Sequence, residues 1–327
     1  MWLDQVAEEV VDPDRRIVDP HHHLWQRDDI GDYVVADLHR DTGSGHRVEQ
    51  TVFVECGAGY RADGPPHLRP VGETAFVAAQ AAEARATSGA RIAGIVGHAD
   101  LRLDVGALDE ALDAHDEAGG GLFRGIRHAG ARAAHPETLS IPGRAPEGLY
   151  GDPGFRAGVR RLGERGLTYD TWHYHHQNGD FAALAAAVPE TVLVLDHFGT
   201  PVGVGPFAGQ REAIFEAWRD DITSIAENEN VVAKLGGLAM PDNGFGWDRA
   251  PSPPTSDAFV DAQARYYHHT IEAFGPSRCM FESNFPVDRR SLSYRVLYNG
   301  LKKIAARYSE GEQDELFSGT ATRVYRL

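Results

Sequence analysis

The sequence contains little cysteine, comparatively few cations and no long apolar run. Its 327 residues include 2 cysteines, Cys56 and Cys279, which cannot build a disulfide framework, so a reducing cytoplasmic compartment fits. Lys and Arg number 32 against 48 for Asp and Glu, and the net charge of -16 argues against nucleic acid or an anionic membrane as a partner, because both require basic surfaces. No stretch reaches the length of a membrane span, and residues 1–9 are acidic rather than apolar as in a signal peptide. We therefore expect a cytoplasmic protein whose partner is a small molecule, with homo-oligomerisation left open.

Other patterns are also missing. No Gly-rich phosphate-binding turn follows the first strand-like run, which disfavours a doubly wound nucleotide-binding sheet. Gly119, Gly120 and Gly121 precede a strand-like run rather than a helix, so we interpret them as a turn. No linker, solenoid-length repeat or low-complexity tract divides the chain. We predict a single domain over residues 1–327.

Strand-like and helix-like segments alternate along the whole chain. Runs rich in β-branched and aromatic residues indicate strands at residues 17–25, 50–56, 91–101, 122–128, 166–172, 191–197, 231–235 and 278–284. Apolar spacing indicates helices at residues 73–86, 107–118, 153–164, 181–188, 210–227, 257–274 and 292–308, whereas a polar loop is predicted between the first two strands. Right-handed crossovers between parallel strands then favour an α/β fold, a (β/α)8 TIM barrel with a C-terminal helical extension.

Three consecutive histidines end the first predicted strand. Side chains alternate along a strand, so His21 and His23 share one face and His22 points away from them. Pro20 lacks a backbone donor, which suits the place where a strand stops pairing. Two imidazoles on one face can bind one metal ion or one anionic substrate.

A barrel carries its chemistry at the C-terminal ends of its strands, and many polar residues fall there. These residues are His21, His23, Glu55, His98, Arg127, His176, His197, Lys234 and the segment 282–288. Each position alone is a weak signal, but together they predict a hydrolytic or metal-assisted site. His21, His23 and His197 can supply neutral nitrogen ligands to Zn²⁺ or Mn²⁺.

The other polar residues have roles that follow from their chemistry. Arg127 offers a planar fork for a substrate carboxylate, or else forms a salt bridge to an acid of the barrel. Glu282 and Asp288 each carry a carboxylate that can activate water or move a proton. Trp172 is expected in the wall of the substrate pocket, although aromatic residues more often belong to a core.

Several short motifs in this order resemble one known family. They are Asp19-Pro20-His21-His22-His23-Leu24-Trp25, Arg124-Gly125-Ile126-Arg127, Tyr174-His175-His176-Gln177, Leu195-Asp196-His197-Phe198-Gly199, Lys234-Leu235-Gly236-Gly237 and the run from Met280 to Asp288. From residue 19 to residue 327 the chain resembles the amidohydrolase superfamily, in the branch that includes sugar-lactone hydrolases and 2-pyrone-4,6-dicarboxylate lactonase. The resemblance implies a (β/α)8 barrel, a site around His21, His23 and His197, and substrate contacts from Arg127 and His176. We expect Gln177, beside His176, to contact the substrate as well.

One position departs from the pattern of the family. Many relatives carry Asp on the eighth strand as a metal ligand or general base, and this chain carries Asn284. An amide cannot accept a proton as a carboxylate does, so the base is Glu282 or Asp288, or no base acts at Asn284. The change also removes an anionic ligand. We therefore expect one divalent metal, zinc or manganese, and leave metal-independent catalysis open.

Three functions compete at this stage. The first is hydrolysis of a lactone or ester of a small carboxylated or hydroxylated compound by water attack on the carbonyl. The second is metal-dependent non-oxidative decarboxylation of an aromatic or enoic acid, and the third is a barrel that binds a ligand without catalysis. The long loops 129–152 and 238–256 are predicted to decide specificity.

Overall fold

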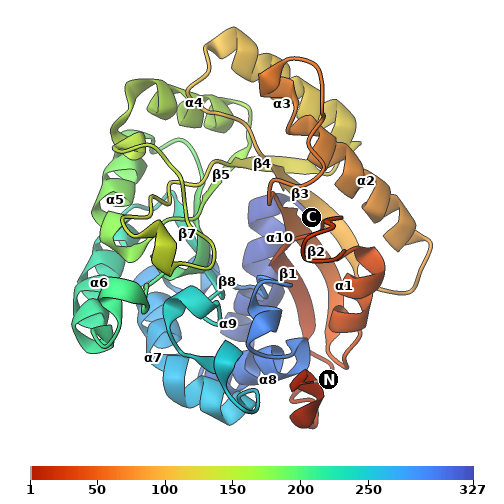
Figure 1. Ribbon diagram of the computed structural model, residues 1–327, viewed down its shortest axis with the longest axis vertical. Coiled ribbons are helices and arrows are strands. Elements are labelled where there is room, and N and C mark those ends of the chain that lie inside the picture. Colours follow the sequence, from red (N-terminus) through yellow and green to blue (C-terminus); the bar gives the residue numbers. More distant parts are fainter. Residues whose placement is uncertain (1) are drawn as a thin grey trace.

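The computed structural model describes residues 2–327, and its centre is a sheet of eight parallel strands. The strands are β1 (Arg16–His22), β2 (Arg47–Val54), β3 (Arg91–Gly97), β4 (Phe123–Arg127), β5 (Thr168–Thr171), β6 (Leu193–Leu195), β7 (Val231–Leu235) and β8 (Cys279–Phe281). Each strand pairs with the next one in the sequence, and Figure 1 shows the strands as a ring with helices around it. The predicted (β/α)8 barrel is confirmed. Of the predicted domain 1–327, Met1 lies outside the described residues.

The ring closes between β1 and the segment that follows β8. The backbone N–H of Asn284 donates to the carbonyl of His21 at 2.9 Å, and that of His23 donates to the carbonyl of Phe285 at 2.8 Å. The eighth strand was predicted to run to residue 284 but ends at Phe281. Asn284 has a φ of 55°, in the left-handed region, where an extended strand cannot continue. The histidines of β1 are thereby joined to the residues after β8.

The strand residues that point inward fill the barrel with β-branched side chains. Val18, Val52, Val96, Val194 and Val232 form one buried cluster, which also contains Met280 and the C-terminal Ala321 and Tyr325. Branched residues pack tightly in layers across a barrel of this size. The interior is therefore solid below the polar strand ends.

Helices cover the outside of the barrel. They are α1 (Val35–Thr42), α2 (Val71–Arg85), α3 (Val105–Gly119), α4 (Pro153–Glu164), α5 (Asn178–Ala187), α6 (Arg211–Ala226), α7 (Ser256–Phe274) and α8 (Tyr294–Ala305). The prediction of a loop between the first two strands is wrong, because α1 lies there. Val35 and Leu38 are buried three residues apart, and Asp37 accepts the N–H of Val34 at 3.0 Å at the start of the helix. The helix has 8 residues, too few to show clear periodicity in the sequence.

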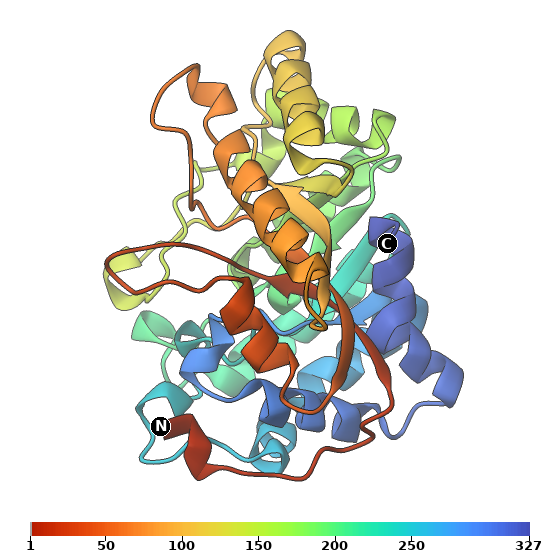
Figure 2. The same cartoon turned by 90° about the vertical axis from the view of Figure 1, so that its right-hand side faces the viewer.

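The predicted C-terminal extension consists of α9 (Glu310–Asp314), a π-helical turn (Glu315–Gly319) and α10 (Thr320–Tyr325). Thr320 bonds the carbonyl of Pro276, just before β8, and Arg326 bonds the carbonyl of Gly166, just before β5. The extension therefore covers the N-terminal end of the barrel. In Figure 2 these dark blue helices lie to the right of the strands, and the loops after β1, β2 and β4 extend to the left. Within residues 2–327, no helix has the length and apolar character that crossing a membrane requires.

Candidate metal centre and active site

Three histidine rings meet at the C-terminal end of the barrel. His21 and His23 come from the end of β1, and His197 comes from the turn after β6, with exposed fractions of 0%, 4% and 3%. The Nε2 atoms of His21 and His23 are 3.3 Å apart, and the ring centres of His21 and His197 are 4.6 Å apart. Two tetrahedral zinc ligands with bonds of about 2.0 Å are separated by about 3.3 Å. His22 instead contacts Thr51, which confirms that it faces away.

Each of the three rings has its Nδ1 next to an acceptor. His23 Nδ1 lies 2.8 Å from the carbonyl oxygen of Val54, and His197 Nδ1 lies 2.7 Å from Oε1 of Glu282. Nδ1 of His21 is 2.8 Å from the other oxygen of Glu282, although the two atoms are not aligned for a hydrogen bond. Metal-binding histidines usually donate one ring N–H to a carboxylate or carbonyl in this way. This arrangement leaves the Nε2 atoms as the available ligands.

The three imidazoles are neutral in this environment. Burial lowers the pKa of His21 and of His23 well below the usual value, and nearby cations add to the effect. Burial also lowers the pKa of His197 to about 3. A neutral imidazole keeps the lone pair that a metal ion needs.

More carboxylates than cationic side chains lie around these rings. Glu55, Asp170, Asp196 and Glu282 surround Arg127 and Lys234 within residues 2–327. Oε2 of Glu282 and both oxygens of Asp196 are buried without a hydrogen-bond partner. Burial raises the pKa of Glu282 to about 8 and that of Asp196 to about 6. Buried negative charge is costly unless a cation balances it.

The donor set therefore fits a divalent metal ion. One ligand atom each from His21, His197 and Glu282 lies within 4.8 Å of the other two. His23 extends this set through its contact with His21. Nitrogen ligands with one nearby carboxylate suit zinc and also manganese.

Two glycines after β7 make room for these groups. A Cβ on Gly237 would lie 2.3 Å from Nδ1 of His197, and a Cβ on Gly236 would lie 2.4 Å from Cγ of Glu282. Such contacts are too close for any side chain. The sequence motif Lys234-Leu235-Gly236-Gly237 thus reflects the close approach of the backbone to the site. His197 itself has a φ of 55°, a strained backbone that the surrounding packing holds.

Arg127 lies in the site, but its guanidinium already has partners. Its Nε donates to Oε1 of Glu55 at 2.8 Å, and its Nη2 donates to the carbonyl of the same residue. Its Nη1 faces Asp196 at 3.5 Å and Nε2 of His21 at 3.5 Å. Of the two interpretations of Arg127, the structure contains the salt bridge to an acid of the barrel.

The side chains of Asn284 and Asp288 bond to each other. The amide of Asn284 donates to Asp288 at 2.8 Å, and the other oxygen of Asp288 accepts the N–H of Ala239 at 3.2 Å. Both side chains are buried, and burial raises the pKa of Asp288 well above the usual value. These contacts connect the β8 segment to the loop after β7.

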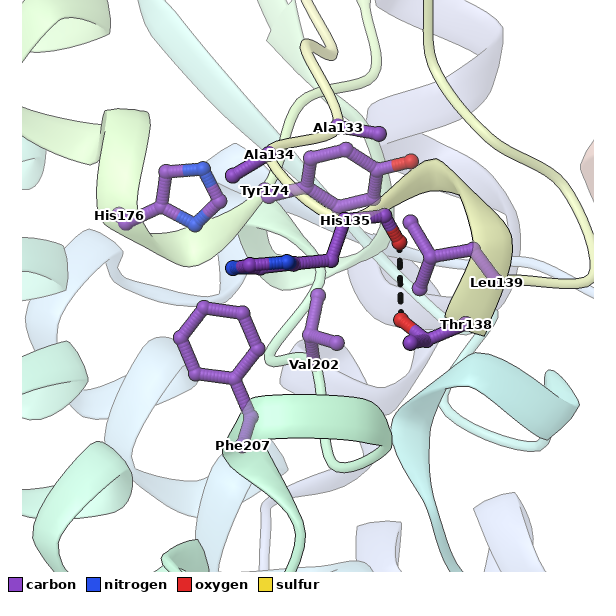
Figure 3. A pocket seen from close by; sticks show the side chains of 9 residues that line it. All are labelled: Ala133, Ala134, His135, Thr138, Leu139, Tyr174, His176, Val202 and Phe207. Carbon is purple, nitrogen blue, oxygen red and sulfur yellow. Dashed lines mark hydrogen bonds between the residues drawn. The ribbon is translucent and has the colours of Figure 1, made fainter.

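The predicted substrate residues after β5 contact the loop after β4. Gln177 donates to the carbonyl of Gly130 at 2.8 Å and accepts the N–H of Arg132 at 3.1 Å. His176 is exposed beside Phe207, and their rings are stacked 5.9 Å apart. Figure 3 shows His176 in the wall of a small pocket, with His135 reaching into it from the loop after β4. The indole N–H of Trp172 is buried without a partner, so it is an available donor.

Sequence comparison assigns this arrangement to a family. The model of the amidohydrolase family matches residues 18–327. The chain belongs to the amidohydrolase family. This amidohydrolase is 30% identical to the L-fucono-1,5-lactonase of Burkholderia multivorans over 256 residues, which cover 78% of this chain and 77% of that protein.

Solved structures agree with the assignment. An amidohydrolase from Burkholderia multivorans with bound zinc superposes with a TM-score of 0.74 at 26% identity, covering 95% of this chain and 99% of that one. A Pseudomonas putida protein assigned as a 2-pyrone-4,6-dicarboxylic acid hydrolase matches at 15% identity and a TM-score of 0.62, covering 95% and 97%. The 5-carboxyvanillate decarboxylase of Sphingomonas paucimobilis matches at 12% and 0.54, covering 96% and 99%. The last two likenesses show the fold alone.

The amidohydrolase site also contains charged residues to which sequence reasoning gave no role. Asp196 has no role in the sequence prediction, although it precedes His197 at the end of a strand. Asp170 lies inside β5, and a carboxylate within a buried strand could have signalled a polar network. For Glu55 and Lys234, the sequence indicates only a position at a strand end. Their pairing is a tertiary property, since their partners are far away in the sequence.

Proposed function

We propose that this amidohydrolase uses one divalent metal ion, zinc in the first instance, to open a lactone of a small hydroxylated or carboxylated acid. The observation that carries the proposal is the meeting of three buried histidines with carboxylate oxygens that lack hydrogen-bond partners. The L-fucono-1,5-lactonase relative supports a lactone as the substrate class. The zinc bound by the Burkholderia multivorans amidohydrolase supports the choice of metal.

The proposed ligands are Nε2 of His21, His23 and His197. A metal ion held there would act as a Lewis acid, which would polarise a carbonyl group and favour attack by water. Glu282 contacts Nδ1 of both His21 and His197. We therefore assign to Glu282 the role of orienting these two rings. Its carboxylate also contributes negative charge close to the metal.

Asp196 is the proposed proton acceptor in place of the family Asp that Asn284 replaces. Both of its oxygens lack hydrogen-bond partners, and Lys234 at 3.2 Å and Arg127 at 3.5 Å hold it beside His21. In the proposed reaction the water oxygen bonds to the lactone carbonyl carbon and passes a proton to Asp196. The bond from this carbon to the ring oxygen then breaks, and the ring oxygen leaves with that proton.

The substrate contacts of the site are proposals as well. Nη1 of Arg127 and the indole N–H of Trp172 are the donors we assign to the oxygens of the substrate. His176 and Gln177 belong to the joined loops after β4 and β5, where we place the distal part of the substrate. Lactones that carry hydroxyl groups suit such a site better than lactones that carry several carboxylates. Few donors of the site are free, and each substrate carboxylate would need donors to pair with.

The test is a panel of aldono- and dicarboxylate lactones, assayed with the zinc-loaded protein and after removal of metal by a chelator. We expect hydrolysis that the chelator abolishes and that zinc restores. Incubation of candidate aromatic and enoic acids, with detection of CO₂, tests the decarboxylase prediction in parallel. Release of CO₂ without lactone hydrolysis would replace the proposal with decarboxylation. Absence of turnover across both panels would leave a ligand-binding barrel.

A further inference from the structure

Tyr325 reaches the polar layer of the site from the opposite end of the barrel. It is the last residue of α10, and its side chain is fully buried among the inward-facing valines. In the view of Figure 1, α10 lies within the ring of strands. A tyrosine placed there has an apolar ring for the core and a hydroxyl that needs a polar partner. Its partner connects the C-terminal extension to the site.

The hydroxyl of Tyr325 starts a chain of buried contacts. It donates to Oδ2 of Asp170, and Nζ of Lys234 lies 2.8 Å from the same oxygen. The same Nζ lies 3.2 Å from Oδ1 of Asp196, and it is 5.3 Å from the centre of the Tyr325 ring. Asp196 in turn faces Arg127 at 3.5 Å and His21 at 3.8 Å. Four residues thus link the helix at one end of the barrel to the histidines at the other.

The ammonium group of Lys234 contacts the carboxylates of both Asp170 and Asp196. How strongly each carboxylate attracts it depends on the other hydrogen-bond donors that the carboxylate has. The ammonium group is fully buried, so its position is set by these acceptors rather than by water. One oxygen of Asp170 accepts a hydrogen bond from the hydroxyl of Tyr325, and the other accepts one from the hydroxyl of Thr168 at 2.8 Å. Without the tyrosine hydroxyl, Asp170 has one donor fewer and attracts Lys234 more strongly. Asp196 then loses part of the contact that holds it.

We infer that Tyr325 is a positioning residue of the active site, which acts through Asp170 and Lys234 to hold Asp196 beside His21. The inference rests on the proposed function, in which Asp196 accepts the proton of the attacking water. A displaced acceptor slows the chemical step but leaves the groups that bind substrate in place. The C-terminal extension is then part of the catalytic machinery as well as a cover for the barrel.

The experiment compares Tyr325→Phe with Tyr33→Phe in the zinc-loaded full-length protein. Tyr33 is also buried, and its hydroxyl donates to the carboxylate of Asp41 at 2.7 Å. Tyr33→Phe therefore removes the same kind of hydrogen bond, but outside the chain of contacts that begins at Tyr325. We expect Tyr325→Phe to lower kcat by about tenfold with KM changed by less than about twofold. Tyr33→Phe is expected to keep kcat even where its melting temperature falls equally. A crystal structure of Tyr325→Phe is expected to show Lys234 closer to Asp170 and farther from Asp196.

Several outcomes decide the inference. A folded Tyr325→Phe protein with unchanged kcat, or with Lys234 unmoved in its crystal structure, overturns it. If Tyr325→Phe does not fold, Thr168→Val removes the other donor to Asp170, and a fall in its kcat at constant KM supports the inference while an unchanged kcat overturns it. If the wild-type protein hydrolyses no lactone, the proposed function fails. The displacement of Lys234 between the two crystal structures then still decides whether Tyr325 holds it.

Discussion

At the scale of single residues, the site is defined by what each buried polar atom contacts. The Nδ1 atoms of His21, His23 and His197 have carboxylate or carbonyl oxygens beside them, so the rings can turn their Nε2 atoms toward one ion. The amide of Asn284, at the position where many relatives carry Asp, donates to Asp288. A carboxylate next to a histidine in the sequence, Asp196, takes its place in our proposal.

The first prediction separates metal ligands from the residue that orients them. We expect His23→Ala to abolish zinc binding, because it deletes a ligand nitrogen. Glu282→Gln is expected to weaken zinc binding by about 10- to 100-fold, which is typical for the loss of a group that orients a ligand. Zinc affinity is measured by competition with a chromophoric chelator. His22→Gln is the control, since His22 contacts Thr51 on the other face of the strand. Equal zinc affinity in His23→Ala and wild type would contradict the assignment.

The second prediction concerns Glu73 and the pH dependence of stability. Burial and then the nearby Glu55 raise the pKa of Glu73 to about 8. A carboxyl whose pKa is higher in the folded state favours folding when protonated. Its contribution is therefore complete below about pH 4.5 and is lost as the pH rises through about 8.

The measurement is the free energy of unfolding between pH 5 and pH 8 for wild type and Glu73→Gln. We expect the variant to remove a slope of up to about 1.4 kcal/mol per pH unit. Its amide oxygen can still accept the N–H groups of Cys56 and Ala58, as Oε1 of Glu73 does at 3.0 and 2.8 Å. The same slope in both proteins would show that Glu73 is ionised throughout this range.

At the scale of elements, two long loops are joined across the mouth of the barrel. Asp242, on the loop after β7, accepts the N–H groups of Ser140 and Ile141, on the loop after β4, at 2.7 and 3.1 Å. Tyr174 adds a bond from the N–H of Gly143 to its hydroxyl at 2.8 Å. These are the loops that the sequence predicts to decide specificity. Their contacts explain how loops rich in proline and glycine keep one conformation.

The third prediction follows from this contact between the loops. Asp242→Ala leaves two backbone N–H groups without their acceptor, so the loop after β4 should loosen. We expect trypsin to cleave faster at Arg132 and Arg144, which lie in that loop, and KM for a lactone to rise by about tenfold. Asp248→Ala on the same loop is the control, because its carboxylate pairs with the exposed Arg249. Unchanged cleavage at Arg132 and Arg144 would show that other contacts hold the loop.

At the scale of the whole molecule, the site is assembled from both ends of the chain. His21 lies near the end of the first strand and Glu282 follows the eighth, and backbone bonds between these segments close the barrel. Tyr325 enters from the far end through the C-terminal extension. Ligands drawn from distant parts of the sequence couple metal binding to folding.

The fourth prediction is that zinc stabilises the entire fold. An ion that binds the folded chain alone stabilises it by RT ln(1 + [Zn]/Kd), about 2.7 kcal/mol at a zinc concentration of 100 Kd. We expect the chelator-treated protein to melt several degrees lower and to recover on addition of zinc. The melting temperature of His197→Ala is expected to be the same with and without zinc. A response of His197→Ala equal to that of wild type would place the stabilising ion elsewhere.

Much of the architecture could be predicted from the sequence. Seven of the helices and all the strands follow from local periodicity, and the His21 and His23 pair follows from the alternation of side chains along β1. The short α1 escaped prediction because its 8 residues span little more than two turns. The pairing of Arg127 with Glu55 and the hydrogen bond of Asn284 to Asp288 could not be predicted. Both depend on neighbours that only the closed barrel provides.

The sequence by itself determined the barrel and the end of it at which the three histidines meet. These properties depend on the repeat of side-chain direction, every two residues in a strand and about every 3.6 residues in a helix, and on the order of the strands. Both can be recognised from neighbouring residues in the sequence. Only the tertiary structure decided which carboxylate faces the histidines and what holds it. That choice depends on distances between β4, β5, β6, β7 and α10, which become fixed only when buried charges find partners across the barrel.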